Sequence, residues 1–420
     1  MKPHLILVGL GYIRPGDPRT TLGHASILAA VRRSGDIDVT PLEYAVNDAG
    51  FNARRVLDDI VSNVRDSGSA VGFGTYVWND EFVRWLIREL RWRGFPGLIV
   101  LGGPQISYTS EGLDQLYPEA SCFISGYGEE AIVSLMRGQT AIQGLRYRGE
   151  TVSTDPAAFS FANAASPHLD GTLASSDFVR WETQRGCPYA CSFCQHQEPG
   201  QKLKLRQFPR ERLDAEMRLF VQRGVKKLVV LDPLFNVNAK HASWVLRRLI
   251  ELGYRGSLSL QCRFEQLTPE FVELCRSLDV TLEFGLQTVH KAEMVAIERH
   301  NNLEKVDYWI RELLRADIRF EVSLIYGLPE QTLESFRESI EWCRSRSVLV
   351  IRAFPLMLLR GTAAYTNRGR WGLIESNETI PVVTSSNTFT SAEREQMRLL
   401  AESLNTPKLV PLRPGTGDAA

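Results

Sequence analysis

The alternation of short apolar runs with amphipathic stretches divides the chain into two α/β halves. In the second half, apolar runs of strand length are separated by amphipathic stretches of ten or more residues, which is typical of strand–helix units around a parallel sheet. With a first strand near 178–183, the pattern predicts about six such units. The later runs are 227–231, 257–260, 280–284, 320–325 and 349–354.

The first half shows the same alternation of apolar runs and amphipathic stretches, with shorter apolar runs. This pattern predicts a doubly wound, Rossmann-like open sheet. Its apolar runs are 5–10, 39–42, 70–74, 98–101 and 122–125. Glycines gather where these runs end, and a glycine lets backbone come close to a bulky flat ligand. We therefore expect a ligand crevice at the carboxyl ends of this sheet. The glycines are Gly9, Gly74, Gly102, Gly103, Gly126 and Gly128.

These patterns predict an α/β protein of two domains, 1–145 and 178–365. The segment between them, 146–177, is rich in Ala, Ser, Pro and Asn and lacks periodicity, so we interpret it as a linker. Residues 366–420 are predicted to form a C-terminal extension with a helix that begins at Ser391. From Pro407 onward the composition predicts a disordered end.

Three cysteines on one short stretch carry the strongest chemical signal: Cys187, Cys191 and Cys194, spaced C-x3-C-x2-C. Three thiolates can each hold one iron of a 4Fe-4S cluster and leave the fourth iron without a protein ligand. That open iron favours substrate chemistry over simple electron transfer. The alternative is a structural zinc site completed by His196, in a zinc-stabilised binding protein without enzymatic activity.

Zinc sites usually combine ligand pairs from separated segments, which disfavours that alternative. A disulfide framework is also disfavoured, because seven cysteines in 420 residues are too few. The remaining cysteines are predicted to be buried free thiols; they are Cys122, Cys262, Cys275 and Cys343.

The cysteine stretch resembles that of the radical SAM enzymes. In that family the open iron binds the amino and carboxylate groups of S-adenosylmethionine (SAM), and the sheet forms a partial (β/α)6 barrel. The resemblance implies that Phe193, just before the third cysteine, lies near the adenine.

Later segments resemble further SAM-binding motifs of this family. Asp232 begins a segment that matches, by position, the one whose backbone receives the methionine amino group. The run from Glu283 to Gln287 resembles a turn whose polar side chains meet the ribose. Taken singly, each residue could equally form a turn or a helix cap. Arg299 resembles an arginine that pairs with the methionine carboxylate, and Tyr326 and Gly327 begin a turn that resembles the one near the adenine.

Parts of the first half resemble the cobalamin-binding domain that one branch of the radical SAM family carries, whereas neither a complete G-x-G-x-x-G nor a Walker sequence occurs. The histidine of the Asp-x-His-x-x-Gly loop is missing between 11 and 23, so the resemblance implies cobalamin without a histidine ligand. Tyr76, Trp78 and Asn79 are the candidates beneath the cobalt. A domain that has lost its cofactor stays an alternative. The implied cobalamin contacts are Gly9, Gly74, Tyr76, Trp78, Asn79, Gly102, Gly103, Gly126, Gly128 and Glu129.

The composition limits the classes of partner and the location that we expect for the protein. Lys plus Arg and Asp plus Glu both count 49, so no general attraction to nucleic acid or to an anionic membrane is expected. No apolar stretch reaches membrane-spanning length and no signal peptide is evident, which predicts a cytoplasmic protein. A local basic excess follows the cysteines and is interpreted as a solvated rim or as a face for an electron donor, such as flavodoxin or ferredoxin, or for an anionic substrate. It comprises Lys202, Lys204, Arg206, Arg210 and Arg212.

The resemblance implies three cofactors: a 4Fe-4S cluster, SAM and cobalamin. SAM would be cleaved to a 5′-deoxyadenosyl radical that abstracts hydrogen from an unactivated carbon of a small metabolite in natural-product biosynthesis, and cobalamin would deliver a methyl group there. Two other outcomes stay open: a cobalamin-assisted rearrangement or cyclisation, and transfer of the 3-amino-3-carboxypropyl group of SAM. No catalytic side chain can be assigned from the sequence.

Overall fold

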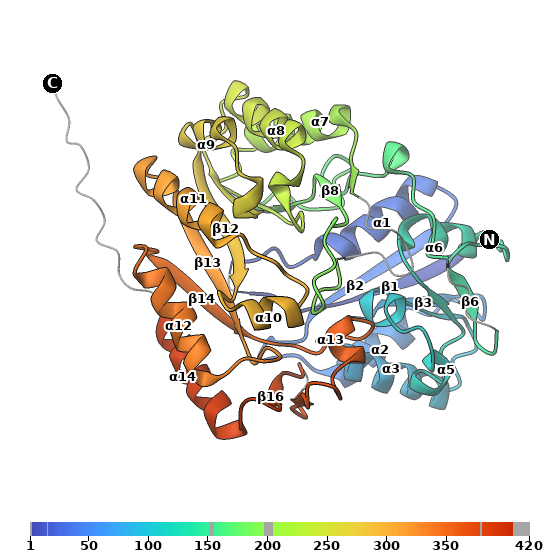
Figure 1. The fold of residues 1–420 in the computed structure, drawn as a ribbon. Coiled ribbons are helices and arrows are strands. Elements are labelled where there is room, and N and C mark those ends of the chain that lie inside the picture. Colours follow the sequence, from blue (N-terminus) through green and yellow to red (C-terminus); the bar gives the residue numbers. More distant parts are fainter. Residues whose placement is uncertain (1, 15, 151–154, 197–204, 379, 406–420) are drawn as a thin grey trace.

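A computed structural model describes residues 2–14, 16–150, 155–196, 205–378 and 380–405 of the chain. Two six-stranded sheets dominate it, one from each half of the sequence. Figure 1 shows the first sheet with its helices in blue and teal, beside the second in green to orange.

The first sheet has the order β2-β1-β3-β4-β5-β6, and all its pairs are parallel except the last. This is the doubly wound sheet that the sequence predicted. Its sixth strand, β6, was not predicted, because it spans only three residues and follows the left-handed turn at Gly144. The strands are β1 (His4–Gly11), β2 (Asp38–Ala45), β3 (Ala70–Gly74), β4 (Ile99–Gly102), β5 (Cys122–Ile124) and β6 (Leu145–Tyr147).

Helices cover both faces of this sheet. One apolar core lies under α1 and α6, which contribute Leu28 and Ile132. The other lies under α2 and α3, which contribute Leu57 and Leu86. A sheet buried on both faces leaves its strand ends as the place where a ligand can bind. The helices are α1 (Leu22–Ser34), α2 (Ala53–Ser62), α3 (Asp80–Trp92), α4 (Pro104–Ser107), α5 (Leu113–Leu116) and α6 (Gly128–Met136).

The second sheet has the order β14-β13-β12-β11-β10-β7, with every pair parallel, and β14 and β7 at its two ends. It is the partial six-stranded barrel that the family resemblance implied. Along β12 and β13 buried side chains alternate with partly exposed ones. One set therefore packs under the helices while the other faces the barrel interior. The strands are β7 (Phe178–Trp181), β10 (Lys227–Val230), β11 (Ser257–Cys262), β12 (Asp279–Gln287), β13 (Arg319–Tyr326) and β14 (Val350–Pro355).

Polar caps begin several barrel helices. The side chains of Asn238, Thr268, Asn302 and Thr332 each accept a backbone N–H from the first turn that follows. Such caps satisfy donors that the helix itself leaves unpaired, and they fix where each helix begins. The helices of this half are α7 (Arg210–Gln222), α8 (Ala239–Glu251), α9 (Pro269–Arg276), α10 (Lys291–Ala296), α11 (Leu303–Arg315) and α12 (Leu333–Arg344).

The C-terminal extension packs against the end strand of the barrel. Helix α14 (Ser391–Asn405) lies along β14, and its own residues Met397 and Ala401 are buried. The predicted disordered end from Pro407 lies outside the described residues. Among the described helices, none is both long and apolar enough to cross a membrane. The remaining elements are α13 (Ala363–Thr366), β8 (Gln184–Arg185), β9 (Arg206–Gln207), β15 (Ile374–Glu375) and β16 (Val383–Ser385).

The segment interpreted as a linker is bonded to the barrel where the structure describes it. The Ser166 hydroxyl donates to Glu216 Oε1 at 2.5 Å. The Trp181 indole N–H and Arg212 donate to the same fully buried carboxylate, at 2.7 and 2.9 Å. A buried carboxylate with several donors is well compensated, so Glu216 fastens the linker to α7 and β7.

Ion pairs also join the two halves directly. Arg360, just after β14, donates to Asp80 at 2.8 Å and to the Tyr117 hydroxyl at 3.0 Å. Arg180 on β7 pairs with Asp17, which follows β1. Both acidic side chains are less than a tenth exposed. Largely buried pairs of this kind hold the two sheets in one relative orientation.

Candidate active site

A single cavity of about 920 Å³ lies where the carboxyl ends of the two sheets face each other. The first sheet contributes the glycine-rich ends of β1, β3 and β4. The barrel contributes Glu182 and Arg185 before the cysteines, Leu231 and Pro233 after β10, and Gln261 on β11. We call this space the shared cavity. Its volume is near the upper end of the range for ligand pockets in proteins.

Nine of the ten residues predicted to contact cobalamin line the shared cavity. The exception is Asn79, whose side chain is fully buried. Its amide donates to the Leu10 and Gly74 carbonyls at 2.9 and 3.0 Å and accepts from the Tyr76 N–H at 2.8 Å. Asn79 therefore shapes the turn that carries Tyr76 and Trp78 and does not itself face the cavity.

Tyr76 and Trp78 form a stacked pair on the wall of the shared cavity. Their ring centroids are 4.5 Å apart with an interplanar angle of 9°. The Trp78 indole N–H donates to the Leu10 carbonyl at 3.1 Å, which fixes the ring. Burial raises the pKa of Tyr76, so its phenol stays protonated. The pair therefore presents a flat, neutral aromatic surface.

The two adjacent glycines after β4 have different roles. Gly103 has φ +91°, and a Cβ there would lie 2.8 Å from the Thr75 carbonyl oxygen. Its backbone thus requires glycine whether or not a ligand binds. At Gly102 a Cβ would meet only Ile124, at 3.6 Å or more. Gly102 is therefore the position where a side chain would enter the cavity without disturbing the backbone.

The cysteines lie on a loop that we call the cysteine loop (186–196), between β8 and β9. The Ser192 N–H donates to the Ile297 carbonyl at 2.9 Å, and its carbonyl accepts the Ala364 N–H at 2.7 Å. The loop is thereby held between α10 and α13. Burial raises the pKa of Cys187, and it raises the pKa of Cys194 to about 11. Metal binding would have to displace these thiol protons.

Within the described parts of the chain, no three His, Cys, Asp or Glu side chains are grouped to hold a metal ion. The ligands of a 4Fe-4S cluster bind separate irons and need not converge on one point. The Arg299 guanidinium lies 3.6 Å from Cys191 Sγ, a favourable place for a cation beside a thiolate.

Gln287 and Arg299 meet beside the cysteine loop, at the end of β12. Gln287 has φ +70°, next to a register shift in the β12–β13 pairing. Arg299 donates to the Gly285 carbonyl. Yet Arg299 Nε and Gln287 Oε1 are buried without a hydrogen-bond partner. An unpaired buried donor and acceptor, side by side, fit a polar ligand such as the methionine and ribose groups of SAM.

Asp232 does not face the shared cavity, although its neighbours Leu231 and Pro233 do. Its carboxylate is fully buried and accepts the Thr183 N–H at 2.7 Å, the Gln184 N–H at 3.2 Å and the Thr183 hydroxyl. Burial raises its pKa to about 7. The Asp232 side chain thus holds the chain that leads into the cysteine loop, and the contact of its segment's backbone with the methionine amino group stays a prediction.

The other residues predicted to contact SAM lie in varied surroundings. Phe193 packs against the barrel core, and Glu283 accepts the Ser259 hydroxyl. Tyr326 is 5% exposed and packs near Phe336, so it belongs to the core beneath α12. Gly327 has φ +87°, and its N–H donates to Gln331 Oε1 at 2.7 Å.

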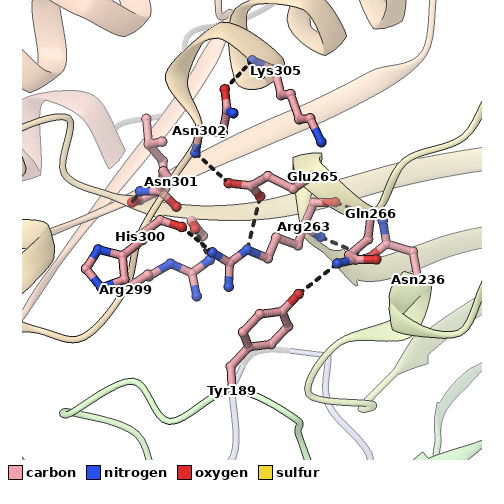
Figure 2. Close-up of polar contacts among 12 residues, drawn as sticks. Tyr189, Asn236, Arg263, Glu265, Gln266, Arg299, His300, Asn301, Asn302 and Lys305 are labelled. Atoms are coloured by element: carbon pink, nitrogen blue, oxygen red, sulfur yellow. Dashed lines mark hydrogen bonds and ion pairs between the residues drawn. The ribbon is translucent and has the colours of Figure 1, made fainter.

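Figure 2 shows a polar network beside the cysteine loop that sequence reasoning missed. Arg263 lies over the Tyr189 ring at 4.2 Å and donates to Glu265 at 3.0 Å and to the His300 carbonyl at 2.6 Å. Gln266 donates to the Tyr189 hydroxyl at 2.7 Å. The only sequence signal was an aromatic residue between the first two cysteines. The network fixes Tyr189, and with it the first half of the loop.

Arg185, two residues before Cys187, was also missed. It donates to Glu129 at 2.7 Å and to Glu182 at 2.9 Å. Its guanidinium lies 4.8 to 5.4 Å from the ring centroids of Tyr127, Phe159 and Phe208. These contacts connect α6 of the first domain to the entrance of the cysteine loop.

The basic run after the cysteines is only partly solvated where the structure describes it, because Arg210 is exposed whereas Arg206 and Arg212 are partly buried. Arg206 lines the shared cavity. Arg210 lies 5.0 Å from the Trp244 ring, and Arg212 is paired with buried Glu216. Lys202 and Lys204 lie outside the described residues.

Comparisons with known proteins agree with this geometry. Residues 181–343 match the model of the Radical SAM superfamily. The cobalamin-dependent radical SAM methyltransferase TokK of Streptomyces tokunonensis is 28% identical over 297 residues, 63% of this chain and 43% of TokK. The 2-(S-pantetheinyl)-carbapenam-3-carboxylate methyltransferase of Streptantibioticus cattleyicolor is 26% identical over 298 residues, with the same coverage. The chain thus spans less than half the length of these curated relatives.

Solved structures share the whole two-domain arrangement. The radical SAM methyltransferase TsrM of Kitasatospora setae, with cobalamin and a [4Fe-4S] cluster bound, superposes with a TM-score of 0.71 at 17% identity. The match covers 94% of this chain and 82% of TsrM. OxsB, with aqua-cobalamin and SAM bound, gives 0.70 at 12% identity, over 95% of this chain and 66% of OxsB. Residues 181–343 thus resemble the radical SAM superfamily, and the chain shares its overall fold with these two solved structures.

Asp232 should make the stability of the fold depend on pH. Its pKa is about 7 in the folded chain, against an ordinary value of 3.8. The folded state therefore binds a proton that the unfolded state has lost between about pH 4 and pH 7. Its contribution to stability is largest at low pH and is lost as pH rises through 7, by at most about 1.4 kcal/mol per pH unit.

Chemical unfolding of the apoprotein between pH 4.5 and 7.5 measures this effect, and Asp232→Asn should flatten the dependence. The exposed Asp177, which binds Lys226 on the surface, provides the control Asp177→Asn, which should leave the wild-type slope. Equal pH profiles for Asp232→Asn and wild type would show that Asp232 is ionised throughout.

Proposed function

We propose that this chain is a cobalamin-dependent radical SAM enzyme that methylates an unactivated carbon of a small metabolite. The observation that carries the proposal is the shared cavity. The glycine-rich crevice of the first sheet and the residues that lead into the cysteine loop line one continuous space. Gly186, Gln195 and His196 of the cysteine loop line this space, whereas the three cysteines, Gln287 and Arg299 do not. The sites proposed for the cluster and SAM therefore adjoin the crevice at the loop, as cofactors that react together require.

The residues present fit the three cofactors. Cys187, Cys191 and Cys194 would hold the cluster, as their spacing implies. Gln287 and Arg299 would bind SAM with their unpaired polar atoms. The crevice from Gly9 to Glu129 would hold cobalamin over the stacked aromatic pair. When bound, the cluster supplies the electron that cleaves SAM, and cobalamin carries the methyl group that is transferred.

The chain's own contribution is to orient these groups and to exclude water. Arg299, beside Cys191, would pair with the methionine carboxylate and draw SAM onto the cluster. The neutral faces of Tyr76 and Trp78 would present no strong ligand to the cobalt from below. Segment 156–159 closes the cavity from the linker side and limits the entry of water.

The substrate class is proposed from the relatives. The 2-(S-pantetheinyl)-carbapenam-3-carboxylate methyltransferase is named for a small-molecule substrate, and TsrM was solved with its tryptophan substrate. A small natural-product intermediate is accordingly the proposed substrate. We also propose an electron donor of the flavodoxin or ferredoxin type, and a cytoplasmic location suited to an oxygen-sensitive cluster.

Anaerobic reconstitution with iron, sulfide and hydroxocobalamin, followed by reduction in the presence of SAM carrying a labelled methyl group, tests the proposal. We expect retention of about one equivalent of cobalamin per chain, and formation of 5′-deoxyadenosine and S-adenosylhomocysteine once a substrate is supplied. The label should appear on the substrate carbon. Label recovered in 5′-methylthioadenosine together with an unlabelled 3-amino-3-carboxypropyl product would show transfer of that group in place of methylation. An isomerised substrate without label would show a rearrangement.

The three cysteines of the loop should be separable from the others by substitution. Replacement of Cys187, Cys191 or Cys194 by Ala should abolish the iron–sulfur chromophore and all SAM cleavage, because each thiolate holds a different iron. Cys262→Ala and Cys343→Ala provide controls, since both thiols are buried away from the loop. Iron and sulfide analysis with absorption spectra measures the outcome. Recovery of zinc without sulfide from intact protein would contradict the proposal.

Arg299→Ala should weaken SAM binding while the cluster remains. The substitution removes a charge-assisted contact to the carboxylate, so the dissociation constant should rise by roughly tenfold to a hundredfold. Equilibrium binding of S-adenosylhomocysteine to the reconstituted protein measures the change. Arg276→Ala on the exposed face of α9 is the control, and an unchanged constant for Arg299→Ala would remove Arg299 from the SAM site.

Gly102→Val should empty the crevice of cobalamin without loss of the cluster. Its branched side chain would enter the cavity, whereas Gly103→Val would push against the Thr75 backbone and destabilise the domain. We expect Gly102→Val to retain less than about a tenth of the cobalamin that wild type retains after desalting. Wild-type retention by a folded, cluster-loaded Gly102→Val protein would place cobalamin elsewhere.

A further inference from the structure

The first turn of α1 places a histidine in the wall of the shared cavity, for which the proposed function so far gives no role. The His24 side chain is 8% exposed, and its Nε2 atom is buried without a hydrogen-bond partner. The nearest charged group is Glu43, whose Oε1 lies 3.7 Å from Nε2, beyond hydrogen-bond range. A buried ring nitrogen without a partner costs free energy until a ligand or water satisfies it.

The ring lies against strand β1, inside the crevice. A Cβ at Gly9 would fall 2.9 Å from His24 Nδ1, so the absence of a side chain at Gly9 is what lets the ring lie there. Gly9 is two residues before the end of β1 at Gly11. His24 therefore lines the cavity from the side of the first sheet, whereas Arg185 and Gln261 line it from the side of the barrel. A corrin ring that serves the cysteine loop would lie toward the barrel, and its nucleotide tail would extend along the first sheet toward His24.

The chemistry of the ring suits an oxygen acceptor. Burial lowers the pKa of His24, so the imidazole is neutral near pH 7, with one N–H donor and one acceptor. The adjacent Glu43 already accepts the Thr20 hydroxyl. The narrow part of cobalamin is its nucleotide tail, whose phosphate and ribose carry several acceptor oxygens. Cobinamide is the same corrinoid without that nucleotide.

We propose that His24 donates a hydrogen bond to the nucleotide tail of the bound corrinoid and thereby makes the site select complete cobalamin over cobinamide. The inference rests on the proposed function, because it requires a corrinoid in the shared cavity. His24 is then a specificity-determining residue in a domain whose loop after β1 supplies no histidine to the cobalt.

Dissociation constants for hydroxocobalamin and for diaquacobinamide, measured by equilibrium dialysis on anaerobically reconstituted protein, test this proposal. Wild type should bind hydroxocobalamin more tightly. His24→Leu should weaken hydroxocobalamin binding by about tenfold, the equivalent of one lost hydrogen bond, and leave the diaquacobinamide constant unchanged. His24→Gln keeps an amide donor and should restore most of the preference. His290→Leu, in the barrel and away from the cavity, should behave as wild type.

Two outcomes would overturn the inference in distinguishable ways. If His24→Leu weakens both ligands equally, or neither, the ring does not bind the nucleotide tail, while corrinoid binding and the proposed function stand. If wild type, fully loaded with cluster, binds neither ligand, the proposed use of cobalamin fails and the role of His24 fails with it. Circular dichroism and iron content of each variant separate these results from misfolding.

Discussion

One buried guanidinium holds the two halves of the active site together. Arg185 lies between Glu129 of the first domain and Glu182 of the barrel, in a cage of three aromatic rings. Such a charge is tolerated only while its partners stay in place, because a buried ion without compensation costs several kcal/mol. The position of Arg185 next to the cysteine loop makes the loop depend on the first domain. The shared cavity exists because this contact, with Arg360 and Arg180, keeps both sets of strand ends facing each other.

Some polar residues near the shared cavity do not line it but hold the backbone of the segments that do. Asn79 and Asp232 are fully buried, and each accepts backbone N–H from a segment that has residues lining the shared cavity. The polar side chains thus fall into a hydrogen-bonded group and an unpaired group. Fully bonded side chains fix the backbone, whereas buried atoms of Gln287, Arg299 and His24 have no hydrogen-bond partner and are available to ligands.

The sequence could predict what local periodicity and spacing determine. Five of the first six strands, all six barrel strands, the glycines at strand ends and the cysteine loop follow from patterns within short windows. Side-chain direction after a strand end does not. The Asp232 carboxylate bonds Thr183 and Gln184, and the Tyr326 ring packs near Phe336, while their predicted contacts with SAM stay predictions. Contacts between the two domains also could not be predicted from the sequence. Arg185 and Glu129 are 56 residues apart, and Arg212 could be understood only once its buried partner Glu216 was known.

The linker has a consequence for how the protein is made. Residues 156–159 line the shared cavity, and Phe159 packs beside Arg185. When the first domain leaves the ribosome, its crevice still lacks this wall and the barrel beyond it, so it is open to a large ligand. Domains generally fold in the order of synthesis. The wall formed by 156–159 is therefore added to the crevice only after the first domain has been synthesised.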